Sequence, residues 1–128
     1  MIAKRCTKYV GALLALCTLL GAAGCGGQPG PQLSAEAQIG KELAGASGCA
    51  GCHGSNGRGG AGPAWVGLYR SEVELDDGTT VIADESYLKR AISDPEADRV
   101  GGYTIKMPAN QLTDSEIQSV LTYIKELG

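Results

Sequence analysis

The feature that most constrains this chain is the pentapeptide CAGCH at positions 49–53. Two thiols three residues apart, followed directly by an imidazole, form the arrangement that attaches a c-type haem. The thiols add across the two vinyl groups of the porphyrin, and the next residue then lies beneath the iron. The pattern therefore predicts one covalent haem c, bound through Cys49 and Cys52, with His53 as the proximal iron ligand.

Two other kinds of site use the same residue types. A thioredoxin-like dithiol requires a strand–helix–strand context, whereas the flanks here are rich in glycine, with eight glycines in the 20 residues from 48 to 67. We expect no regular structure in that stretch, because glycine favours turns with positive φ and close backbone approach. A zinc site requires four ligands, and this region offers three.

The second axial ligand is expected to be Met107, followed directly by Pro108. Residues 1–24 read as a removable leader, and Met107 is the one methionine that remains after them. A lone methionine more often fills a core, but a Met-Pro pair in a polar loop between two helices is a poor core position. The chain has a single histidine, which excludes a bis-histidine haem. Ligation by histidine and methionine raises the reduction potential.

The first 25 residues have the pattern of an export signal. Lys4, Arg5 and Lys8 precede a short apolar stretch from 10 to 20, and small residues lead to Cys25. The ending Ala-Ala-Gly-Cys is similar to the lipobox of bacterial lipoproteins, in which the cysteine carries the lipid. An ordinary signal peptide and a retained anchor are the alternatives, although the apolar stretch is short for a membrane span.

This interpretation divides the chain into three parts: a lipoprotein signal peptide (1–24), the lipidated Cys25 with a Gly/Pro-rich tether (25–33), and a single domain (34–128). The whole chain has 11 basic and 14 acidic residues and a net charge of −3. Cleavage before Cys25 would remove three basic and no acidic residues, so the charge becomes −6. No basic stripe is present, which argues against nucleic-acid binding.

The domain is predicted to be mainly helical. Ser34 begins a helix that ends near Ser47, with Ile39, Leu43 and Ala44 on its apolar face. A short β-hairpin is expected where residues 73–75 and 80–82 flank a tight Asp-Gly turn at 77–78.

Two more helices complete the expected set. Asp84 caps a helix over 85–93 that ends before Pro95, with an apolar face formed by Tyr87, Leu88, Ala91 and Ile92. Thr113 and Glu116 form a capping box. It begins a C-terminal helix whose repeating apolar residues are expected in the core: Ile117, Val120, Leu121, Ile124 and Leu127.

From about residue 40 to 127 the chain resembles class I cytochromes c. The matching pieces are Gly40 in the first helix, the CAGCH motif, Gly62-Pro63, Met107-Pro108, and Tyr123 in the last helix. The run from Asp77 to Tyr103 is similar to the cytochrome domain fused to subunit II of caa3-type haem–copper oxidases. We expect the cytochrome module alone, since no sequence here matches the copper-binding part of that subunit.

The resemblance implies an all-α class I cytochrome c fold, with three to four helices around one covalently bound haem and a short β-hairpin. It also implies that the Pro63 carbonyl accepts the His53 Nδ1–H, and that Gly40 and Tyr123 lie where the terminal helices cross. Trp65 and Tyr103 are candidate hydrogen-bond donors to the haem propionates, with ordinary packing as the alternative. Arg58 is expected to be a solvated loop cation.

The function expected on these grounds is single-electron transfer between respiratory-chain partners, without catalysis. The donor would be a quinol-oxidising complex or another donor, and the acceptor a terminal oxidase or reductase. The protein would lie outside the cytoplasm, in the periplasm or on the outer face of the cytoplasmic membrane, held by its lipid. One alternative is a bound relay subunit of an oxidase or reductase complex. Another is a ligand-binding haem sensor or small peroxidase-like enzyme, which requires Met107 to leave the iron.

Overall fold

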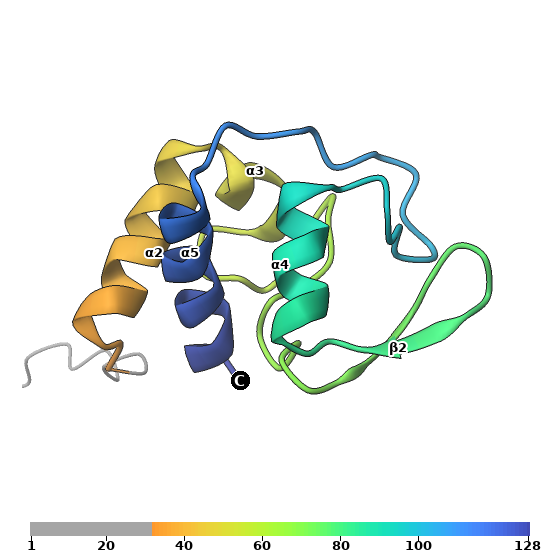
Figure 1. Cartoon of the computed structure of the whole chain (residues 1–128), viewed down its shortest axis with the longest axis horizontal. Helices are drawn as coiled ribbons and strands as arrows, with labels where there is room; N and C mark the ends of the chain where they lie inside the picture. The colour runs from red at the N-terminus through yellow and green to blue at the C-terminus, as the bar shows by residue number, and fades with distance from the viewer. Residues whose placement is uncertain (1–31) are drawn as a thin grey trace, which may run out of the picture. The chain divides into compact units, whose positions relative to one another are not determined.

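The computed structural model describes residues 32–128, in which the helices pack together and a small two-stranded sheet lies to one side of them (Figure 1). The elements in order are α2 (Ala35–Ala46), α3 (Cys49–His53), β1 (Glu72–Glu74), β2 (Thr80–Ile82), α4 (Glu85–Ser93) and α5 (Asp114–Glu126). The expected fold class, helical with one short hairpin, is confirmed. The predicted signal peptide, Cys25 and most of the tether lie outside the described residues. Within 32–128, no helix is long and apolar enough to cross a membrane.

The helices at the two ends of the domain, α2 and α5, pack closely against each other. Gly40 is buried at their crossing, where a Cβ atom would overlap the carbonyl oxygen of Ser119 and lie 2.9 Å from the backbone nitrogen of Val120. The expected apolar face of α2 is wrong in part, because Ile39 is 49% exposed while Ala37 and Gly40 are buried. So close a crossing admits only small residues, and the larger isoleucine is therefore placed outside it.

Side chains cap three of the helices as the sequence predicts. The Ser34 side chain accepts a hydrogen bond from the backbone of Ala37 at the start of α2. Asp84 accepts from Tyr87 at the start of α4, and Thr113 and Glu116 form the expected capping box at α5. Each cap satisfies backbone N–H groups that have no partner inside the helix.

The hairpin forms with Val73 opposite Val81, and Gly78 has the positive φ of 82° that the turn requires. Its first strand spans 72–74 instead of the predicted 73–75. Leu75 still donates its N–H to the Thr79 carbonyl at 2.8 Å, and it also forms an isolated bridge with Val100. The backbone N–H of Gly101 also donates to the Glu74 carbonyl, at 2.9 Å. The hairpin is thereby joined to the chain that leads into the Met107 loop, which we define as residues 102–112.

The expectation that 48–67 lacks regular structure is wrong at its start, where α3 forms one helical turn. Gly48 adopts a left-handed conformation (φ 80°) and lets the chain leave α2 and begin a new helix at once. Gly54, with φ 82°, ends that turn. The glycines therefore delimit a short helix instead of preventing one.

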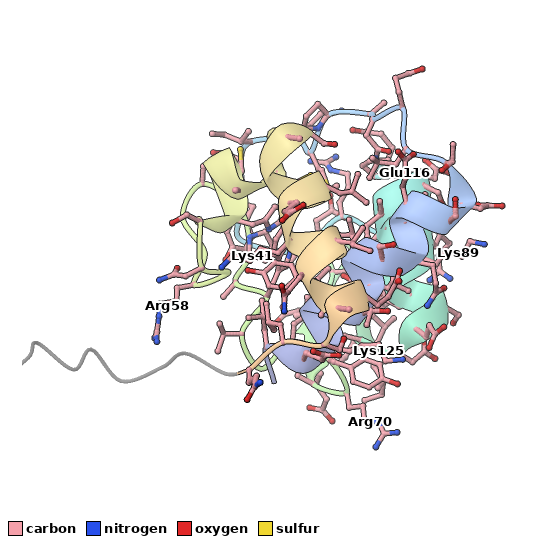
Figure 2. The ribbon with its side chains drawn as sticks, turned by 90° about the vertical axis from the view of Figure 1, so that its left-hand side faces the viewer. Lys41, Arg58, Arg70, Lys89, Glu116 and Lys125 are labelled. Atoms are coloured by element: carbon pink, nitrogen blue, oxygen red, sulfur yellow. The ribbon has the colours of Figure 1, made fainter. Side chains whose placement is uncertain are left out.

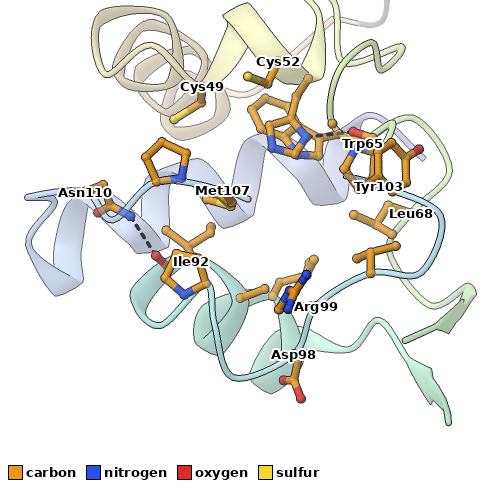
Figure 3. A pocket seen from close by; sticks show the side chains of 18 of the residues that line it. Cys49, Cys52, Trp65, Leu68, Ile92, Asp98, Arg99, Tyr103, Met107 and Asn110 are labelled. Atoms are coloured by element: carbon orange, nitrogen blue, oxygen red, sulfur yellow. Dashed lines mark hydrogen bonds between the residues drawn. The ribbon is translucent and has the colours of Figure 1, made fainter. Parts of the chain in front are cut away.

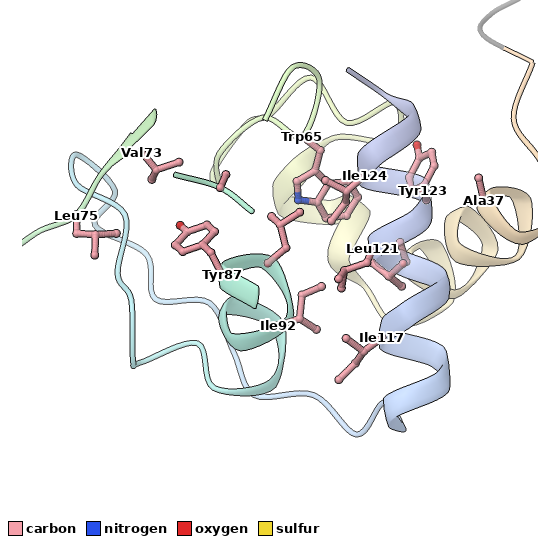
Figure 4. Packing of buried hydrophobic residues seen from close by; sticks show 14 residues of the cluster. Ala37, Trp65, Val73, Leu75, Tyr87, Ile92, Ile117, Leu121, Tyr123 and Ile124 are labelled. Carbon is pink, nitrogen blue, oxygen red and sulfur yellow. The ribbon is translucent and has the colours of Figure 1, made fainter. Parts of the chain in front are cut away.

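The buried core is formed mainly by α4 and α5 together with Trp65 and the hairpin (Figure 4). The predicted core faces of both helices are confirmed, except that Ala91 and Leu127 are only half-buried. Tyr123, buried in α5, presents its ring edge-on to Trp65 with centroids 6.0 Å apart. Many of these apolar side chains also line a large cavity.

Candidate functional site

A cavity of about 880 Å³ opens between α3, α4 and the Met107 loop (Figure 3). It lies near the upper end of the range for sites that hold small-molecule ligands and cofactors. All the residues predicted to bind the cofactor line this one cavity, although they lie as far as 58 positions apart in the sequence: Cys49, Cys52, His53, Pro63, Trp65, Tyr103 and Met107.

The two cysteines lie on the single turn of α3. Residues three apart in a helix share a face, and Figure 3 shows both sulfur atoms at the same wall of the cavity. Both thiols are free and half-buried. Burial raises the pKa of the Cys49 thiol, with a smaller contribution from Cys52 nearby. The helix therefore presents two thiols side by side on the cavity wall.

His53, the last residue of α3, is buried and oriented by a hydrogen bond to the backbone. Its Nδ1–H donates to the Pro63 carbonyl at 2.7 Å, which is the contact that the family resemblance implies. Burial lowers the pKa of the imidazole, and the Pro63 bond opposes that effect only in part. The ring is thus held neutral with its Nε2 lone pair free, which is the form that ligates metals.

The His53 ring is also held by its neighbours. The indole of Trp65 stacks on it, with centroids 4.6 Å apart and an angle of 17° between the planes. Gly62 is buried beside the ring, and a Cβ atom there would lie 3.1 Å from its Cε1. The sequence predicted a role for Trp65 at the haem, but nothing in it indicated this stack.

The glycine-rich loop after α3 is ordered by backbone hydrogen bonds. Gly59 donates to the His53 carbonyl at 2.8 Å, and Gly62 donates to that of Cys52 at 3.0 Å. Trp65 donates to the Gly57 carbonyl at 2.7 Å. Gly57 has a φ of 70°, and a Cβ there would clash with the Leu127 side chain at 2.6 Å. The loop thus carries Pro63 and Trp65 to the imidazole along a defined path.

Met107 reaches the cavity from a loop that has little support of its own. Its side chain is half-buried and turned inward, with the sulfur in the cavity (Figure 3). Among the described residues, 104–111 make no backbone-to-backbone hydrogen bond. Lys106 pairs with Glu96 at 3.0 Å, but both side chains are more than half exposed, and such pairs contribute little.

Asn110 ties this loop to the rest of the domain. Its Nδ2 donates to the Ile92 carbonyl in α4 at 2.7 Å, and its Oδ1 accepts from the backbone of Leu112 at 3.1 Å. The sequence did not identify Asn110, because its partner in α4 lies 18 positions away. An asparagine three residues after the methionine, in a loop without strong turn signals, is the only available hint.

Charged and polar groups at the rim of the cavity include one that sequence reasoning missed. Arg99 lines the cavity, and its Nε lies 3.3 Å from a carboxylate oxygen of Asp76. Tyr103 is 40% exposed at the rim. Arg58 is exposed and lies outside the cavity lining, as expected for a solvated loop cation (Figure 2).

The residues present fit a haem c. Two thiols share one helical face, a neutral imidazole presents a free nitrogen lone pair, and a thioether enters the same cavity. The surrounding walls are mainly apolar, from Leu68, Leu88 and Ile92 among others. Such a donor set suits an iron porphyrin held through two thioether bonds. Fold and site together define a small helical haem protein.

Comparison with known families agrees with this. The sequence profile described as Cytochrome c matches residues 37–128. The chain therefore belongs to the cytochrome c family, as a class I c-type cytochrome that binds one haem c covalently. Membership implies an electron carrier rather than a catalytic enzyme. A search of curated proteins finds no match.

Proposed function

We propose that this protein is a membrane-tethered mono-haem cytochrome that carries single electrons between respiratory-chain partners, with His53 and Met107 as the two axial ligands. The observation that supports it best is the meeting of these two side chains in one cavity. They lie 54 positions apart in the sequence, and each presents a donor atom of the kind that haem iron accepts.

When bound, the haem supplies a one-electron couple. The residues of the chain hold that couple in place and restrict it to electron transfer. His53 keeps its Nε2 available through the Pro63 hydrogen bond, and Asn110 keeps the Met107 loop closed. With His53 and Met107 both bound to the iron, no coordination position would be left for a substrate. Apolar walls exclude water, and Trp65, Tyr103 and Arg99 are candidates to pair with the propionates.

The optical spectrum of the matured full-length protein tests the axial pair. The oxidised protein should show the methionine–iron charge-transfer band, and the reduced protein should bind carbon monoxide poorly. Met107→Ala should lose the band and open the haem to carbon monoxide while the haem stays attached. A native protein without the band, or one that binds carbon monoxide rapidly at neutral pH, would instead favour the sensor or peroxidase-like alternative.

The tether is the second part of the proposal. A charged start, a short apolar stretch and the small residues before Cys25 support export and lipidation at that cysteine, outside the cytoplasm. Cys25→Ser should release the holoprotein from the membrane fraction while leaving its haem spectrum unchanged. If the variant has lost its leader and still sediments with membranes as the native protein does, Cys25 is not the anchor.

The partners are proposed from charge. The domain has an excess of acidic groups, which would steer it toward a partner with a basic surface. Electron transfer with such a partner should slow as the ionic strength rises. Rates that are flat across salt would show that charge does not guide the encounter.

The resemblance of residues 77–103 to an oxidase-linked cytochrome domain favours a second candidate, a relay bound within an oxidase or reductase complex. The likeness covers the end of the hairpin, α4 and the chain that leads to Tyr103. Co-purification with a terminal oxidase in mild detergent would support this candidate. Recovery of the cytochrome alone would support the shuttle.

A further inference from the structure

Trp65 lies directly against the imidazole of His53. Its indole lies nearly parallel to the His53 ring at a centroid separation of 4.6 Å, and only 6% of the residue is exposed. Figure 4 shows it beside Tyr123 and Ile124 of α5. It therefore touches the predicted iron ligand on one side and the main helix of the core on the other.

Three contacts fix the indole in this orientation. Its backbone N–H donates to the Gly57 carbonyl at 2.7 Å, Tyr123 meets it edge-on at 84°, and the His53 ring covers one face. Because the backbone at Trp65 is anchored and its ring is in contact with both His53 and Tyr123, the indole cannot turn away without displacing these neighbours. The packing of the domain therefore holds the indole stacked on the imidazole.

A stacked indole does not interact equally with the two redox states of the site. An imidazole bound to iron through Nε2 carries more positive charge when the iron is oxidised, because the ferric ion withdraws more electron density from it. The face of an indole is the negative part of its quadrupole and attracts a neighbouring positive group. The contact is thus stronger in the oxidised protein.

We propose that Trp65 is a positioning residue for His53 whose indole face stabilises the oxidised state and so lowers the midpoint potential. The proposal rests on the proposed function, in which His53 ligates the iron. It predicts that weakening the indole face without changing its shape raises the potential. A role in packing alone predicts no shift for that change. For a truncation it predicts a lower potential, because a gap beside the imidazole admits water, which favours the more highly charged oxidised state.

The sequence contains a single tryptophan, so a tryptophan analogue supplied during expression alters this position alone. Fluorine atoms withdraw electron density from the indole face with little change in shape. We expect the midpoint potential of the haem-loaded full chain to rise stepwise from one to several fluorine atoms. Potentials that are flat across the series, or that fall, would overturn the proposal.

Two substitutions extend the series. Trp65→Phe keeps a weaker aromatic face and should raise the potential a little, whereas Trp65→Leu keeps only apolar bulk and should raise it more. For Leu we expect the ratio of reduced to oxidised protein at a fixed ambient potential to rise roughly twofold or more. A lower potential in Trp65→Leu would assign the residue to packing. If that variant does not fold, the fluorinated series decides alone.

Spectra recorded on the same samples separate this proposal from the one on which it rests. If the native protein shows a six-coordinate spectrum with the methionine band and the potentials do not move, only the role of Trp65 is wrong. If the native spectrum shows no histidine-coordinated haem, the proposed function is wrong, and the role of Trp65 is overturned with it.

Discussion

Asn110→Ala provides the sharpest test of how the Met107 loop is held. The substitution removes the donor to the Ile92 carbonyl and the acceptor for the Leu112 N–H, with lengths of 2.7 and 3.1 Å. Each such bond contributes about 0.5–1.5 kcal/mol net, so opening of the loop should become easier by about 1–3 kcal/mol. With Met107 as the proposed axial ligand, that corresponds to roughly a fivefold to 150-fold larger population in which it has left the iron.

An added ligand can bind only to this open population, so its apparent affinity rises in the same proportion. The assay is optical titration of the reduced holoprotein with carbon monoxide and of the oxidised holoprotein with imidazole. Gln111→Ala is the matched control, since Gln111 is the exposed neighbour of Asn110. Asn110→Asp keeps an acceptor for the Leu112 N–H but loses the donor to Ile92. Its affinity for the added ligand should lie between those of Asn110→Ala and Gln111→Ala. Native-like affinities in Asn110→Ala would show that the loop does not depend on this side chain.

Three further predictions concern the stability of the fold. Gly40→Ala should lower the free energy of unfolding in urea by about 1–3 kcal/mol through overpacking at the α2–α5 crossing. Gly45→Ala in the same helix, where a Cβ meets nothing within 4 Å, should be neutral or slightly stabilising; equal losses in the two would refute the close-crossing argument. Replacing both Cys49 and Cys52 should leave a largely unfolded apoprotein, because the haem fills the centre of a small core; native-like near-UV circular dichroism in that variant would contradict this. Hydrogen bonds from Thr113 lower the pKa of Glu116. The native holoprotein should therefore have a higher free energy of unfolding than Glu116→Gln at pH values above the ordinary pKa of 4.5, and this advantage should shrink as the pH falls below it. An advantage that does not depend on pH would exclude the carboxylate as its source.

Local chemistry made much of the fold predictable. Thr113 and Asp84 cap their helices because short polar side chains satisfy exposed N–H groups, and that relation lies within four residues of sequence. The CAGCH motif is equally local, since the spacing of its thiols is set by the porphyrin. The cavity then unites its residues with Met107 because the fold brings the loop back over α3.

Features that depend on contacts across space were not predictable from one sequence. Ile39 has the periodicity of a core residue, yet α2 turns its small residues inward because Gly40 allows the backbones to meet. The role of Asn110 depends on a carbonyl in α4, and the stack of Trp65 on His53 depends on the path of the intervening glycine loop. Each of these contacts joins residues whose proximity becomes known only from the three-dimensional structure.

One contact at the start of α2 has a practical consequence. The backbone N–H and the hydroxyl of Ser34 both donate to the carboxylate of Glu126, at 2.8 and 2.6 Å, so the beginning of α2 is fastened to the end of α5. At 1.5 Å per residue, the twelve residues of α2 place this point about 18 Å along the helix axis from its end near the cysteines. An affinity tag or an electrode linker joined after Gly128 would therefore emerge at the base of the helix pair (Figure 1), and immobilisation there would leave the side that carries the two thioethers facing the solution.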